Sequence, residues 1–330
     1  MNKQKRRMLT RITGYLAKFV FLLGSLLPFI AQAEKEKSFK VTLPLNNWVS
    51  QRVITQAVGQ LIAEQGYDVD YHHVSSTDQW GALKRGLIHF QLEVWQASME
   101  SYFNTLVADN YILDVKTHSA KGREDWWYPS YVENYCADLP SWQALNNCSL
   151  LFAENSHQSK GAFLSGPWQY KDAELIRALG LNFKIKRFDN QRALWQHLEL
   201  SESLNKPIVM LNWSPNWTDI HLSGTFIDFP AYEEKCVTDP KWGLNSQMNH
   251  DCGNPKQGWI KTAAWSGLPK AAPCLYEFIG KIDLSHFMIA KASALVIVDK
   301  MPEKEAATHW LNLFKSSTKG WLKPFAQCPA

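Results

Sequence analysis

The sequence predicts an α/β fold of two lobes, each a doubly wound sheet flanked by helices, with a cleft between them. Short apolar or alternating segments take turns with segments whose apolar residues recur at helical spacing, which favours sheets covered by helices. This alternation runs to about residue 108, breaks at 122–135 (GREDWWYPSYVENY), and then restarts. The break predicts extended chain that passes between the lobes.

The first lobe begins with the clearest elements. Residues 39–43 (FKVTL) predict a strand, and from Val49 the apolar residues recur at i, i+3 and i+4, which is typical of a helix with one buried stripe. Gly66 is placed to end that helix. The next expected elements are a strand at 69–74, a helix at 78–85, a strand at 89–95 and a helix at 99–108.

The second lobe is expected to repeat this order. It should contain helices at 139–146, 172–179 and 191–204, and strands at 149–153, 183–188 and 208–213. Residues 226–229 are expected to return the chain to the first lobe, where a strand at 260–265 and three helices follow. The predicted division is 34–124 for the first part of lobe 1, 125–228 for lobe 2, and 229–330 for the second part of lobe 1, including a stapled surface loop at 232–258.

The chain opens with the pattern of an export signal. Basic residues precede an apolar run at 19–30, and Ala31-Gln32-Ala33 fits a small-residue cleavage site, so we expect cleavage after Ala33. Residues 1–33 hold six of the 35 basic residues and no acid, which leaves 29 basic against 31 acidic residues. The mature net charge of about −2 gives no support to a nucleic-acid partner.

All six cysteines lie in the mature part, and an even count in an exported chain favours disulfides. Six cysteines allow about fifteen connectivities. We favour the sequential one: Cys136 with Cys148, Cys236 with Cys252, and Cys274 with Cys328. A zinc site is the rival interpretation, but no CxxC or paired-histidine spacing supports it, so we expect no metal.

Three of the fifteen tryptophans share one context. Trp48, Trp95 and Trp213 each closely follow a predicted strand, and Ser214-Pro215 stops the last strand at once. Ligands of open α/β sheets bind at the carboxyl ends of the strands. Several aromatic faces around one cavity attract a quaternary ammonium, which has no N–H to satisfy, although large aromatic side chains more often serve only as core packing.

The chain order and these tryptophans bring out a family likeness. The mature chain resembles the glycine betaine, choline and related quaternary-amine binding proteins of ABC importers. The similarity covers nearly all of residues 38–325, and its best segments are NNWVSQRVITQAVGQLIAEQGYDV, GLIHFQLEVWQASM and IVMLNWSPNW. It implies a type II periplasmic binding fold, in the periplasm, that closes over a quaternary amine and delivers it as a monomer to an ABC permease in the inner membrane. It implies no catalysis and no cofactor.

The resemblance also implies a set of site residues. The aromatic box would fall on Trp48, Trp95, Trp213 and one aromatic of the 126–128 cluster, most simply Trp127. Some choline-binding relatives carry an acid two places after the first box aromatic, where this chain has Ser50. The polar ligand contacts of the family would fall on Ser50 and on the loop residues Asn155 and Ser156.

One further residue, Glu93, and two alternative functions remain to be considered. Glu93 precedes Trp95 by two residues and could touch a cationic ligand, although a surface or paired carboxylate is the favoured interpretation. An enzyme on the same scaffold would need a nucleophile in the cleft, such as a free thiol. A sensor would bind alike but dock to a membrane kinase, which the sequence cannot separate from transport.

Overall fold

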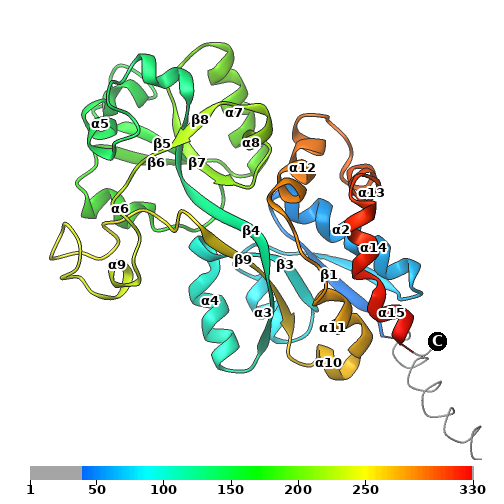
Figure 1. The fold of residues 1–330 in the computed structure, drawn as a ribbon. Helices are drawn as coiled ribbons and strands as arrows, with labels where there is room; N and C mark the ends of the chain where they lie inside the picture. The colour runs from blue at the N-terminus through cyan, green and yellow to red at the C-terminus, as the bar shows by residue number, and fades with distance from the viewer. Residues whose placement is uncertain (1–38, 329–330) are drawn as a thin grey trace, which may run out of the picture.

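The computed structural model describes residues 39–328, so the expected export signal at 1–33 lies outside the described range. Figure 1 shows two α/β lobes joined by the long strand β4 (Ile112–Pro129). The predicted α/β class and the two-lobe architecture are confirmed. No helix within residues 39–328 has the length and apolar character needed to cross a membrane.

One sheet extends through both lobes. Its strand order is β3-β9-β4-β7-β5-β6, with β8 added beside β4. The strands are β3 (Phe90–Trp95), β9 (Gly258–Trp265), β7 (Val209–Ser214), β5 (Gly161–Ser165), β6 (Phe183–Arg187) and β8 (Gly224–Phe226). Up to Gly122 strand β4 pairs with β9, and from Arg123 it pairs with β7. The two lobes therefore share one continuous strand.

Helix α2 (Val49–Glu64) lies on the buried side of the first lobe. A two-stranded parallel sheet of β1 (Val41–Leu45) and β2 (Val69–His73) flanks α2, which packs against α12 (His286–Ile297) and α13 (Glu303–Leu313). The lobe is completed by α3 (Gln79–Lys84), α4 (Gln96–Ala108), α10 (Leu268–Ala271), α11 (Pro273–Ile279), α14 (Lys315–Trp321) and α15 (Lys323–Gln327).

The second lobe is built around parallel strands β5, β6 and β7. Its core contains Trp126, whose ring stacks on Phe163 with 3.8 Å between centroids. The surrounding helices are η1 (Ser130–Asn134), α5 (Trp142–Asn147), η2 (Ser149–Phe152), α6 (Asp172–Ala178), α7 (Gln191–Ser203) and α8 (Thr218–His221).

The strand expected at 149–153 is wrong, because this segment forms the 3-10 helix η2 and the strand lies at Gly161–Ser165. Leu150 and Leu151 are exposed, whereas all five residues of β5 are buried, so only β5 has both faces covered. Gly161 is required there, since a Cβ would stand 2.5 Å from the carbonyl oxygen of Ser149.

The polar loop at 232–258 packs against helix α6. Figure 1 shows it with α9 (Glu234–Thr238) beside α6. Asn245 Nδ2 donates to the carbonyl of Ala178 at 2.8 Å. The chain re-enters the first sheet only at Gly258, which stands in register with Gly122 of β4. Each chain segment that crosses between the lobes therefore has a glycine at the crossing.

All three expected disulfides are confirmed, so none of the six cysteines is a free thiol. Cys236–Cys252 staples the loop, and Cys274–Cys328 ties α15 to α11. A disulfide stabilises the fold mainly by restricting the unfolded chain, more so when the closed loop is longer.

We expect the first and the last disulfide along the chain to differ in how much they add to the free energy of unfolding. The Cys274–Cys328 separation is 54 residues and the Cys136–Cys148 separation is 12. Loop-closure entropy gives about 4 kcal/mol for Cys274–Cys328 and about 3 kcal/mol for Cys136–Cys148. Denaturant unfolding of the two double Cys→Ala variants measures both losses, and a larger loss for the shorter loop contradicts the argument.

Candidate functional site

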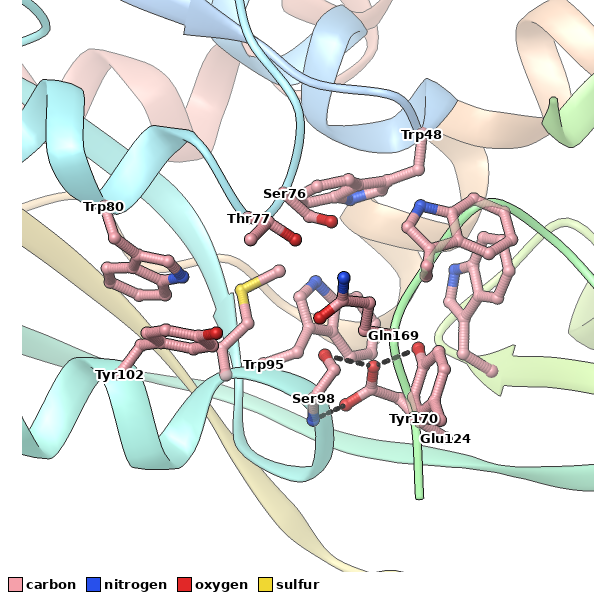
Figure 2. A pocket seen from close by; sticks show the side chains of 13 residues that line it. Trp48, Ser76, Thr77, Trp80, Trp95, Ser98, Tyr102, Glu124, Gln169 and Tyr170 are labelled. Atoms are coloured by element: carbon pink, nitrogen blue, oxygen red, sulfur yellow. Dashed lines mark hydrogen bonds between the residues drawn. The ribbon is translucent and has the colours of Figure 1, made fainter. Parts of the chain in front are cut away.

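A cavity of about 60 Å³ lies between the lobes (Figure 2). Residues of both lobes line it: Trp48, Ser76, Thr77, Trp80, Trp95, Ser98, Met99, Tyr102 and Glu124, together with Trp168, Gln169, Tyr170 and Trp213. This volume suits a solute of a few heavy atoms. Among the described residues, the lining contains no lysine, arginine or histidine.

The three tryptophans expected from strand ends meet at this cavity. Trp48 follows β1 and is the N-cap of α2, while Trp95 ends β3 and is the N-cap of α4. Trp213 comes from β7 of the other lobe. Gly122 lets the ring of Trp95 pack closely, because a Cβ there would stand 3.0 Å from the ring. Strand ends of two lobes thus deliver indoles to one place.

Besides Trp80 of α3, the cavity has a further tryptophan that our sequence analysis also missed, Trp168. It follows β5 and meets Trp213 edge to face, with 5.1 Å between ring centroids. Its Nε1 donates to Asn47 Oδ1 at 3.2 Å, across the lobes. Trp168 also follows a strand, but this was not recognised because the strand was predicted at 149–153 and not at Gly161–Ser165.

Trp127 does not reach the cavity. Successive residues of a strand point to opposite faces, so Trp126 and Trp127 cannot both face the same way. Trp126 packs in the lobe core on Phe163, and Trp127 lies against Gly224, where a Cβ would clash with its ring. Both rings serve packing within the second lobe.

The structure brings none of the three predicted polar contacts to the cavity lining. Ser50 is buried and donates to Glu93 Oε2 at 2.9 Å. Asn155 and Ser156 are exposed in the loop before β5. That loop is at the amino end of the strand, whereas Trp168 follows the carboxyl end, so the two segments lie at opposite edges of the sheet.

Glu93 lies behind two of the indoles and does not line the cavity. Its Oε2 accepts from Trp48 Nε1 at 2.8 Å and from Trp95 Nε1 at 3.2 Å, in addition to Ser50. The residue is fully buried, and this burial raises the pKa of the Glu93 carboxyl to about 7 although the three donors oppose the shift. One carboxylate oxygen therefore fixes both rings from the rear.

Glu124 is the carboxyl group that faces the cavity. It accepts from Ser98 Oγ at 2.7 Å and from Tyr170 hydroxyl at 2.6 Å, as the dashed lines of Figure 2 show. Burial raises the pKa of Glu124, and the hydrogen bonds lower it by less. The cavity thus combines aromatic walls with an acidic group, a surface that suits a small cation.

A family model described as the substrate binding domain of the ABC-type glycine betaine transport system matches residues 40–313. The chain belongs to this family. Its members are substrate-binding proteins of betaine- and choline-type ABC transporters. These binding proteins work in the periplasm or outside the cell and are binding proteins rather than enzymes. The family predicted from the sequence is therefore confirmed.

Individual relatives agree with this assignment. The trimethylamine N-oxide-binding protein of Pelagibacter ubique is 31% identical over 280 residues, covering 82% of this chain and 87% of the relative. A choline-binding protein solved with choline has a TM-score of 0.68 at 15% identity, covering 86% of this chain and 91% of that one. Lactococcal OpuAC in its closed form with glycine betaine gives 0.64 at 17% identity, covering 86% and 98%. These two structures show the same fold.

In addition to the bond between Ser98 and Glu124, two hydrogen bonds join the lobes of this substrate-binding protein beside the cavity. Besides Trp168–Asn47, the backbone N–H of Val49 donates to Gln191 Oε1 at 2.9 Å. Gln191 begins α7 of the second lobe, and Val49 begins α2 of the first. A free N–H of the first turn of α2 is thereby satisfied by the opposite lobe. Both bonds hold the two lobes together in this structure.

We expect Gln191→Leu to weaken ligand binding without touching the cavity. Losing one closing hydrogen bond of about 1 kcal/mol lowers the population of closed protein and so the apparent affinity about fivefold. Calorimetric titration measures the change, with Gln196→Leu on the exposed side of the same helix as the control. Equal affinities of the two variants contradict a closing role for Gln191.

Proposed function

We propose that this protein captures a small methylated amine between its lobes and delivers it to an ABC permease of the inner membrane. Export by the segment at 1–33, a periplasmic location and action as a monomer belong to the same proposal. The observation that carries it is the convergence of Trp48, Trp95, Trp168 and Trp213, from both lobes, on one cavity that lacks a basic side chain.

The physical basis is attraction between a cation and the faces of aromatic rings. Each ring contributes about 0.5–2 kcal/mol, more where the cation is desolvated. A trimethylammonium head has no N–H group, so it enters such a cavity without leaving a donor unpaired. Because the rings come from both lobes, bound ligand stabilises the closed protein relative to the open one.

The charges around the cavity favour a ligand without a carboxylate of its own. Glycine betaine carries one, and the lining offers it Glu124 but no lysine, arginine or histidine among the described residues. Trimethylamine N-oxide, the ligand in the name of the Pelagibacter relative, has an oxygen that can accept a proton from a carboxyl group. Burial raises the pKa of Glu124, which favours the protonated form that can donate to this oxygen. We therefore propose trimethylamine N-oxide or choline as the ligand.

We further propose that the lobes divide at the crossing glycines. The first lobe then consists of 39–122 and 258–328, and the second of 123–257. Two observations support this boundary: the change of partner along β4 and the packing of the 232–258 loop on α6.

Titration of the purified protein tests the ligand class. We expect trimethylamine N-oxide and choline to bind at least about tenfold more tightly than glycine betaine, because an unpaired ligand carboxylate beside Glu124 costs at least 1.4 kcal/mol. Tryptophan fluorescence follows binding, since five indoles line the cavity. No response to any of the three at millimolar concentration contradicts the proposed function.

A pair of tryptophan variants tests the site itself. Trp168→Ala removes one wall of the cavity and the bond to Asn47, so we expect about a tenfold or greater loss of affinity. Trp127→Phe keeps an aromatic ring in the lobe core and should bind within about twofold of wild type. The reverse order, with Trp127→Phe the weaker binder, restores the original assignment of Trp127 and refutes that of Trp168.

A further inference from the structure

Glu93 is a buried carboxylate whose charge has no partner among residues 39–328. It lies on β3 at a point where pairing with β9 is interrupted between Gln91 and Val94. Oε2 accepts the three hydrogen bonds described above, and Oε1 has no hydrogen-bond partner among residues 39–328. Burying an ionised carboxylate this way is costly unless a positive charge compensates it.

The charged groups around Glu93 do not provide that compensation. Arg52 of α2 is ion-paired with Glu303 at 2.7 Å. His118 of β4 lies behind β3 with Nε2 at 2.9 Å from the Leu92 carbonyl oxygen, and burial lowers its pKa to about 4, so it is neutral at pH 7. Glu124, on the cavity side, is itself acidic. The shift at Glu93 has burial and hydrogen bonds as its causes, and no charged neighbour.

The two indoles stand between Glu93 and the cavity. Trp48 and Trp95 line the cavity, and both donate their ring N–H to the same oxygen of Glu93. A hydrogen bond to an anion polarises the donor, which makes the ring a better acceptor for a cation on its face. The negative charge also acts through the low-dielectric interior on any cation in the cavity.

We propose that Glu93 is the buried counter-ion and positioning residue for the methylated ammonium: it touches no ligand atom, yet its charge selects a cation over a neutral molecule of the same shape. This inference rests on the proposed function. It also links ligand binding to a proton. In the empty protein the carboxyl group holds a proton part of the time, and the arriving cation favours the carboxylate, so the O–H bond of Glu93 breaks and the proton passes to solvent.

The sign of the pH dependence follows from this linkage. Burial raises the pKa of Glu93 to about 7 in the empty protein, and a nearby cation lowers that pKa. Affinity for a cation therefore rises as the pH increases from about 6 to about 8, and protons are released on binding near pH 7. A neutral ligand shows neither effect.

Calorimetry on wild type and Glu93→Gln tests the inference, with trimethylamine N-oxide, choline and 3,3-dimethylbutan-1-ol, the neutral carbon analogue of choline, as probes. We expect Glu93→Gln to bind choline about tenfold or more weakly and to lose much less affinity for the neutral analogue, whose binding does not depend on the charge. Titration in buffers of different ionisation enthalpy should show fewer protons released by the variant. Glu124 is present in both proteins, so the difference reports Glu93.

The second lobe offers a matched control. Asp172 is also buried, accepts from the indole of Trp126 at 2.8 Å and has a second oxygen without a partner among the described residues. Trp126 does not line the cavity, so Asp172→Asn should change neither the affinity nor the number of released protons. Ser50→Ala is a second variant on the Glu93 side, because losing a donor to the carboxylate should move the pH profile of choline binding upward.

Each result has a definite meaning. Equal choline affinity and equal proton release in wild type and Glu93→Gln overturn the inference. An equal loss for choline and its neutral analogue also overturns it, because Glu93 then only holds the rings in place. If the wild-type protein binds none of the methylated amines, the proposed function fails and this inference fails with it. The thermal midpoint of unfolding is measured for wild type and for Glu93→Gln. A midpoint of the variant at or above that of wild type shows that any loss of binding is not caused by a loss of folding.

Discussion

The whole arrangement depends on strand β4, which belongs to the sheets of both lobes. Along its length it exchanges one antiparallel partner, β9, for another, β7, and the exchange occurs between Gly122 and Arg123. Glu124 follows directly, at the cavity. A backbone ladder shared by two sheets keeps their edges aligned, so strand ends that are far apart in the chain face each other across one small space.

The aromatic rings that line the cavity also pack against other side chains of their own lobes. Trp213 contacts both Trp168 and Trp195 edge to face or tilted, so the cavity wall continues into the core of the second lobe. In the first lobe, Glu93 holds Trp48 and Trp95 from behind. Rings fixed in this way lose little conformational entropy when a ligand arrives, which is the advantage of a preorganised site.

Local sequence signals were enough to predict much of the fold and three of the five tryptophans that line the cavity. Trp48, Trp95 and Trp213 were found because a strand end followed by a helix start or a Ser-Pro turn is visible in a few consecutive residues. Trp168 was missed because one strand was placed about ten residues too early. Trp127 was chosen from its cluster, although a strand sends neighbouring side chains to opposite faces.

The role of Glu93 could not be predicted, since its donors Trp48 and Ser50 stand 45 and 43 residues away and only the folded chain brings them together. The same holds for the bond between Val49 and Gln191, which are 142 residues apart. The polar composition of the loop at 232–258 indicates a surface position but gives no information about which surface it covers.

The facing glycines at 122 and 258 limit how this molecule can move. Both crossings lie at the same level of the ladder, so the backbone connection between the two lobes is a two-stranded neck. Side-chain contacts such as His286–Asp219 and Ser293–Asn216 also join the lobes away from this neck. Such a neck bends readily about one axis in its own plane, while torsion would have to break ladder hydrogen bonds. We therefore expect the lobes to open mainly by bending at this neck, which would bring the indoles of the two lobes back towards each other on closing.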